Sequence, residues 1–190
     1  VPVKSMQEPY NWKPPERSSR HGDVALLWEI AEKQKISETI DRICLGRSDI
    51  PGITPGKLLT IWAINRVIDP QSATQLDQWL QTTSLPSLLG ISGDDFRKDD
   101  FYGALDAVAH FDRKLGKICE NISRIEEMLY THWRESHPLP LGEEEVIAYD
   151  LTAVPFFGDT CPIAVKGHNA SHSEDNQIKL GVLISKFDKM

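Results

Sequence analysis

Apolar residues recur at helical spacing through most of the first 139 positions, in segments separated by proline, glycine and capping residues. From Asp23 onward, two short apolar stretches predict a pair of helices, and Ser37 is the predicted cap of the second. Thr54 followed by Pro55 is a favoured helix start, and an apolar stripe covers Leu58 to Val67. This segment predicts the strongest helix of the front half.

The remaining front segments also favour helices. Between Asp99 and Ser136, the apolar spacing predicts two further helices, of which the second is long and starts near Ile118. The segment before Asp23 differs, because it contains four prolines and shows no hydrophobic period. We therefore predict an extended arm over residues 1–22 and an all-helical N-terminal domain over residues 23–139.

The hydrophobic period changes from helical to extended near residue 140. The run from Val146 to Val154 is β-rich and apolar, which is typical of a strand buried on both faces. Cys161 to Val165 predicts a short hairpin partner, and the polar stretch from Gly167 to Asn176 predicts a loop. Ile178 to Ile184 alternates as a second strand does. The predicted fold class is α+β, with residues 140–190 holding the first strands of an incomplete domain.

Composition narrows the class of protein. Hydrophobic residues make up 40% and charged residues 26%, which is typical of a folded, soluble chain. A net charge of -7 argues against a surface that is basic all over, and it weakens a nucleic-acid interpretation without excluding it. Three widely spaced cysteines without a CxxC pair favour a reducing cytoplasm. Neither a long apolar run nor a signal-peptide pattern directs the chain to a membrane.

Asp150 is the residue that most needs an explanation. A carboxylate in the middle of an apolar strand is costly unless it is paired, hydrogen-bonded or placed at a metal ion. From the residues alone, two interpretations are evenly matched. Asp150 either faces solvent or a neighbouring turn, or it is a functional carboxylate.

Three groups of residues carry a resemblance to a known family. Ala148 to Phe157, with the sequence Ala-Tyr-Asp-Leu-Thr-Ala-Val-Pro-Phe-Phe, resembles the first catalytic strand of DDE transposases, in the broad group related to insertion sequence four. Lys166 to His172 and Asn176 to Leu183 resemble the loop and the Gln-x-x-x-Gly-Leu strand that come next. Ile36 to Ile43 and Gly103 to Asp106 are similar to the group's N-terminal domain. Many members have Gly-Tyr-Ser where this chain has Gly-His-Asn at 167–169.

The resemblance implies a ribonuclease-H-like fold for residues 140–190, with Asp150 as the first catalytic metal ligand. It implies Mg²⁺ as cofactor, the terminal repeats of a DNA element as partner of the helical domain, and a homodimer as the assembly. The family holds two ions roughly 4 Å apart with three carboxylates. No second aspartate or glutamate for that role is found here, so this chain alone is predicted to be inactive and to hold no metal stably.

Other candidate residues are weaker. Thr152 is better explained by strand preference than by a hydrogen bond to Asp150. His168 and His172 are spaced like a zinc pair, but a solvated loop near DNA phosphate is the better interpretation. The tryptophans on helix faces are assigned to the core rather than to base stacking: Trp28, Trp62, Trp79 and Trp133. The basic residues that could contact phosphates are Lys4, Lys13, Arg17, Arg20, Lys57 and Arg66.

Two alternatives to the transposase interpretation stay open. The chain could be a non-catalytic DNA-binding or dimerisation module whose working part is the helical region, or a degenerate remnant with no role. A basic patch on the helices would favour the module.

Overall fold

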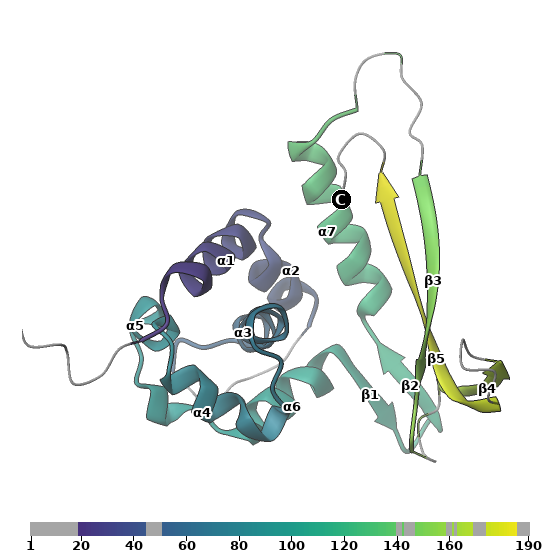
Figure 1. The fold of residues 1–190 in the computed structure, drawn as a ribbon, viewed down its shortest axis with the longest axis horizontal. Helices are drawn as coiled ribbons and strands as arrows, with labels where there is room; N and C mark the ends of the chain where they lie inside the picture. Colours follow the sequence, from purple (N-terminus) through teal and green to yellow (C-terminus); the bar gives the residue numbers. More distant parts are fainter. Residues whose placement is uncertain are drawn as a thin grey trace, which may run out of the picture. The chain divides into compact units, whose positions relative to one another are not determined.

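The chain forms two compact units, Val1–Trp133 and Arg134–Met190, in a computed structural model. The structure describes residues 19–44, 51–139, 142, 147–158, 161, 163–168 and 174–185. The elements of the first unit are α1 (Gly22–Lys33), α2 (Ile36–Ile43), α3 (Pro55–Ile68), η1 (Ala73–Gln75), α4 (Leu76–Gln81), α5 (Leu85–Leu89), η2 (Gly93–Asp95), α6 (Lys98–Val108), β1 (Ala109–Asp112), β2 (Lys117–Glu120) and most of α7 (Ile122–Ser136) (Figure 1).

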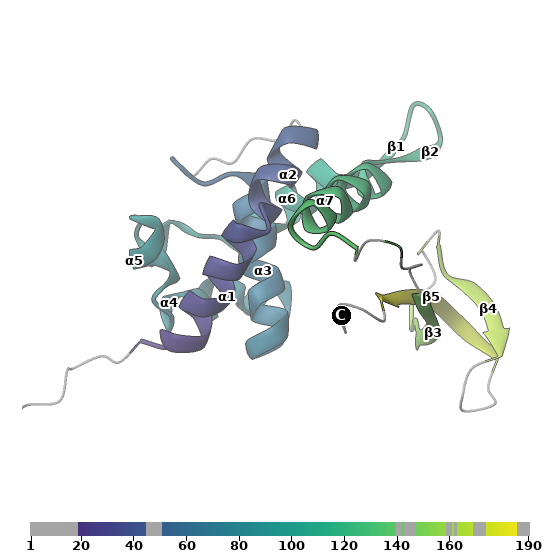
Figure 2. The same ribbon diagram turned by 90° about the horizontal axis from the view of Figure 1, so that it is seen from above.

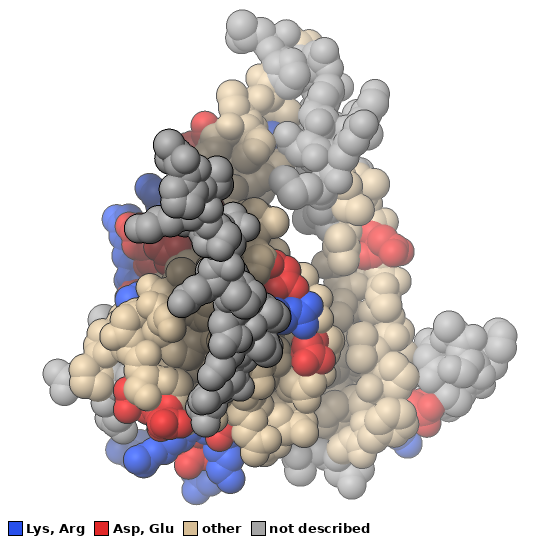
Figure 3. Space-filling view, turned by 60° about the vertical axis from the view of Figure 1, so that its left-hand side comes forward, with Lys and Arg blue, Asp and Glu red and all other residues tan. Residues whose placement is uncertain are grey.

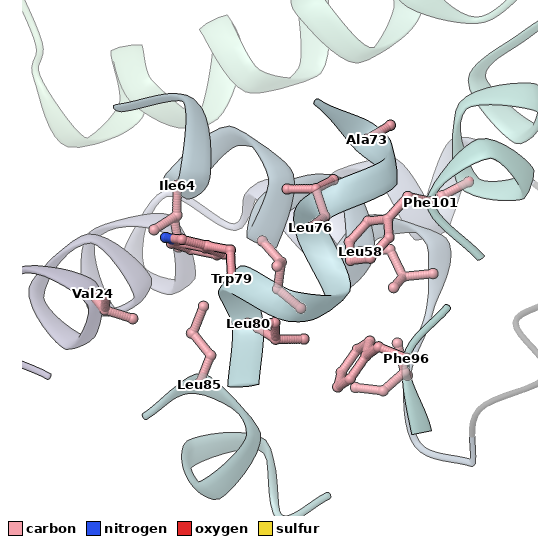
Figure 4. Packing of buried hydrophobic residues seen from close by; sticks show 13 residues of the cluster. Val24, Leu58, Ile64, Ala73, Leu76, Trp79, Leu80, Leu85, Phe96 and Phe101 are labelled. Atoms are coloured by element: carbon pink, nitrogen blue, oxygen red, sulfur yellow. The ribbon is translucent and has the colours of Figure 1, made fainter. Parts of the chain in front are cut away.

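The core of the first unit is built around α3. Helices α1, α2 and α6 pack against α3, and the views of Figure 1 and Figure 2 agree on this arrangement. Side chains from several helices and turns converge in one apolar cluster, in which Leu58, Leu76 and Phe101 are at most 1% exposed (Figure 4). Burying such a side chain stabilises the fold by roughly 1.5–3 kcal/mol. A second cluster joins Ile40, Ile43 and Cys44 to Ile125 of α7.

The start of α3 confirms the predicted cap. Thr54 is extended and its hydroxyl accepts a hydrogen bond from the Lys57 N–H at 3.2 Å, with Pro55 at the first helical position. The predicted cap at Ser37 is wrong. Helix α2 begins directly after Lys35, which adopts a left-handed conformation with φ 53°, and Ser37 lies inside the helix with its side chain buried.

The N-terminal region is not all-helical, which corrects a second prediction. Strands β1 and β2 form an antiparallel hairpin between α6 and α7, with Ala109 opposite Glu120 and Asp112 opposite Lys117. The Asp112 carboxylate accepts hydrogen bonds from the N–H groups of Lys114 and Leu115, so the aspartate closes the turn. This turn chemistry interrupts the helical spacing of the apolar residues on either side.

The predicted arm ends in a fixed position. Residues 1–18 lie outside the described residues, but Arg20 pairs with the segment after α4. Its N–H donates to the Thr82 carbonyl at 2.9 Å, and its carbonyl accepts from the Ser84 N–H at 2.9 Å. The Arg20 guanidinium also forms an ion pair with Asp23.

The second unit is a small antiparallel sheet in the order β3 (Ile147–Pro155), β5 (Glu174–Ser185), β4 (Val165–His168). The two predicted strands are therefore confirmed, and the fold is α+β. The predicted loop over 167–176 is wrong in part, because β4 includes Gly167 and His168 and β5 begins at Glu174. The hairpin partner expected at 161–165 lies a few residues later, in β4.

The expectation that the first strand is buried on both faces is wrong for the described residues. Tyr149, Leu151 and Val154 are 61%, 55% and 41% exposed. Alternate side chains of a strand point to opposite faces, so exposure of these three residues leaves both faces of the sheet open. The apolar pattern correctly predicted a strand, whereas burial depends on what packs against it.

Candidate functional site

Asp150 lies in the middle of β3, opposite Val182 of β5. Residues that face each other across an antiparallel ladder share one face of the sheet, as do alternate residues along each strand. The face that contains Asp150, here called the Asp150 face, consists of Ala148, Asp150, Thr152 and Val154 from β3 and Ile178, Leu180, Val182 and Ile184 from β5. Asp150 is the only ionisable residue among these eight described positions.

The pairing of β3 with β5 is set by close packing on the opposite face. A Cβ at Gly181 would lie 2.9 Å from Cε2 and from the hydroxyl oxygen of Tyr149, so the glycine leaves room for the tyrosine side chain of the neighbouring strand. Further along, the buried side chain of Gln177 occupies the space beside Gly167 of β4. Gly181 and Gln177 thereby help fix the register that places Asp150 opposite Val182.

The chemistry available around Asp150 is limited to one carboxylate and one hydroxyl. Thr152 is its polar neighbour on the Asp150 face, and both side chains are exposed. Among the described residues, no group of three or more histidine, cysteine, aspartate or glutamate side chains is placed to hold a metal ion. Since Mg²⁺ prefers several oxygen ligands in an octahedral arrangement, these residues do not by themselves fit a complete magnesium site.

The histidines of the predicted zinc pair cannot be placed as ligands. His168 ends β4, and neither its side chain nor any part of His172 belongs to the described residues.

Three of the four tryptophans assigned to the core take the positions predicted for them, and Trp133 belongs to neither apolar cluster. Trp79 is 6% exposed within the main cluster, and Trp28 and Trp62 pack against that cluster. Trp133 is half-buried beside Tyr130, with ring centroids 6.2 Å apart.

Three of the six basic residues proposed as phosphate contacts belong to the described residues. Arg20 is paired with Asp23 and the Lys57 ammonium donates to the Gly52 carbonyl at 2.9 Å, while Arg66 is exposed on α3. Lys4, Lys13 and Arg17 lie outside the described residues. Figure 3 shows basic and acidic side chains in mixed groups on the face it presents. That face therefore lacks the basic surface that would favour the module.

Sequence reasoning missed the hairpin and the basic residues at its tip, Arg113, Lys114 and Lys117. The signal was present. Asp112 and Gly116 bracket the short stretch Arg-Lys-Leu between two β-prone segments, with Phe111 before it and Ile118 after it. This pattern is typical of a hairpin with a four-residue turn.

Comparison of the chain with protein-family models, with curated proteins and with solved structures finds no match. Among the described residues, no helix has both the length and the apolar character needed to cross a bilayer.

Proposed function

We propose that this chain is the front part of a DDE-type DNA transposase. In this proposal residues 140–190 are the opening strands of a ribonuclease-H-like catalytic domain, and Asp150 is its first metal ligand. The helical part binds the terminal repeats of the element. The protein works in a reducing cytoplasm, which the free thiols of Cys44, Cys119 and Cys161 support.

The observation that carries the proposal is a single carboxylate at the centre of an apolar sheet face. Val182, Leu180 and Ile184 surround Asp150 on β5 and are 50%, 53% and 41% exposed. Such a face loses water when another layer packs on it, and a carboxylate buried there without a partner would cost several kcal/mol. A metal ion or a cationic partner would remove that cost, which supports a ligand role for Asp150.

Mg²⁺ would supply activation of water or of a 3′-hydroxyl in the complete site. Asp150 would contribute one oxygen ligand and would help fix the ion at the surface of the sheet. In the family, an aspartate and a glutamate from later elements complete the site.

The test is an excision assay with the complete coding sequence, in which Asp150 is replaced. We expect Asp150→Asn and Asp150→Ala to lower excision by more than about 100-fold, because loss of a ligand disrupts the metal site. Thr152→Val is the matched control, since it changes a residue on the same face and keeps the β-branched shape. Excision by Asp150→Ala at the level of the Thr152→Val control would refute the proposal.

The alternative module is favoured by one observation, namely that the first unit has its own core. All described hydrophobic residues under 9% exposed lie between Val24 and Ile125, within that unit. As a module, the protein would bind DNA or form a dimer with equal strength whether or not Asp150 is replaced. Mobility-shift and size measurements on the Asp150→Ala chain separate the two functions.

A further inference from the structure

The hairpin of the first unit carries three cations within five positions at its tip. Arg113, Lys114 and Lys117, here called the basic tip, are exposed. In the part of the chain that the structure describes, none of the three forms an ion pair. These cations are therefore available to a partner, in a protein whose overall charge is -7.

The two acidic residues of the hairpin are directed toward the backbone. Asp112 accepts from the N–H groups of Lys114 and Leu115 at 2.8 and 3.1 Å, and Glu120 accepts from the Ile122 N–H at 2.5 Å. Lys117 is opposite Asp112 in the ladder but forms no ion pair with it in the described chain. The two carboxylates thus form hydrogen bonds within the turn and at the start of α7, and within the described hairpin they do not pair with the cations of the basic tip.

The basic tip is held on an ordered support. Gly116 adopts the left-handed conformation that the turn requires, with φ 61°. At the base, the Asn121 N–H donates to the Val108 carbonyl at 2.9 Å and connects the ends of α6 and α7 around the hairpin. Because the turn is already ordered, less backbone entropy is lost when the hairpin binds a partner.

We propose that the basic tip binds the backbone phosphates of duplex DNA. Lysine and arginine are the side chains that contact phosphates, and each such contact releases counterions from the duplex. A two-stranded ribbon also fits the major groove of B-form DNA, whereas the deep, narrow major groove of A-form RNA excludes it. The inference rests on the proposed function for the choice of DNA as the partner, and it adds the surface that touches the duplex.

The experiment measures binding of the whole chain to a fluorescent 30-base-pair DNA duplex by anisotropy, over a range of salt concentrations. The test variant changes Arg113, Lys114 and Lys117 to glutamine. Because three phosphates are then no longer neutralised, the slope of log K against log salt should become shallower by about 2.7. The control variant, Lys33→Gln with Arg42→Gln and Lys98→Gln, has the same net charge and should change the slope by less than about 1.

A second variant distinguishes an effect of the charges from an effect of misfolding. Arg113→Lys with Lys114→Arg and Lys117→Arg keeps all three charges and should keep the parental slope, while circular dichroism checks the fold of every variant. Equal slopes for the glutamine variant and the control would overturn the inference, as would absence of DNA binding by the parent or stronger binding to an RNA duplex of equal length. Excision that depends on Asp150 could survive each of these results, so failure of the basic tip is distinguishable from failure of the proposed function.

Discussion

Replacement of Gly56 by alanine tests the packing of α2 against α3. Gly56 lies in the first turn of α3, where its N–H donates to Asp41 Oδ1 of α2 at 2.8 Å. Its carbonyl accepts from the Thr60 hydroxyl at 2.8 Å, and Thr60 Oγ1 lies 2.9 Å from Ser37 Oγ. Because the Thr60 hydroxyl donates its proton to the Gly56 carbonyl, the Ser37 hydroxyl must donate to Thr60 Oγ1. A chain of polar contacts therefore crosses the two helices at this glycine.

Alanine has no room at this position. A Cβ on Gly56 would overlap the backbone oxygen of Ser37 and would lie 2.8 Å from Asp41 Oδ1. In an open helix the same change stabilises by about 0.5–1 kcal/mol. Here α2 must move away, which costs about 1–3 kcal/mol for overpacking and weakens a hydrogen bond to a carboxylate worth about 1.5–3 kcal/mol. We expect a net loss of about 2–4 kcal/mol in the free energy of unfolding.

Gly103→Ala is the matched control, because Gly103 lies within α6 and a Cβ there would meet nothing within 4 Å. Urea unfolding followed by tryptophan fluorescence reports on the first unit, where Trp62 and Trp79 lie. At a slope of about 2 kcal/mol per molar urea, the Gly56→Ala midpoint should fall by about 1–2 M. The Gly103→Ala midpoint should rise slightly. An equal rise for both variants would refute the account of this helix crossing.

Three further predictions follow from single groups. Asn65 is fully buried and joins α3 to the turn after it through two hydrogen bonds. Asn65→Leu should therefore lower the free energy of unfolding by about 2–3 kcal/mol in the same urea assay. A variant as stable as the parent would contradict this prediction. Burial raises the pKa of the Cys44 thiol, and the carboxylate of Asp41 acts in the same direction. Cys44 should therefore be the last of the three cysteines to be alkylated at pH 8. Labelling of Cys44 ahead of Cys119 and Cys161 would contradict this prediction. The hydrogen bond from Arg20 lowers the pKa of the Asp23 carboxyl below 3.8, its ordinary value. The ionised carboxylate therefore stabilises the folded state above pH 3.8, and this contribution is lost as the pH falls through the pKa of Asp23 in the folded state. The difference in urea midpoint between parent and Asp23→Asn should therefore be larger at pH 5 than near pH 2.

Local chemistry explains which elements could be predicted from the sequence. Thr54 accepts a hydrogen bond from the Lys57 N–H, and Pro55 has no N–H that needs a partner. Both effects are local, so the helix start was visible in the sequence. The strand from Ile147 to Pro155 was visible for a similar reason, because an apolar β-prone run favours extended backbone in most contexts.

The errors come from features that depend on distant contacts or on turn geometry. Ser37 has the chemistry of a cap, yet it lies close to Thr60 and the buried hydroxyl pair stabilises it inside α2. The two ends of the hairpin were assigned to the helices on either side because Ala109 and Ile118 continue their apolar spacing, while Asp112 and Gly116 set the reversal between them. Asp150 could be placed on a strand from the sequence, but the apolar face around it required the register with β5.

The most direct test of the central claim is to determine the coding sequence that follows the codon for Met190. We predict further strand patterns, one of which carries an aspartate, and then a helix that carries a glutamate. Those two residues would complete the three carboxylates that two-metal DNA cleavage requires, with Asp150 as the first. Sequence of an unrelated kind at that position would contradict the catalytic role of Asp150 and would leave the helical module as the working part of the protein.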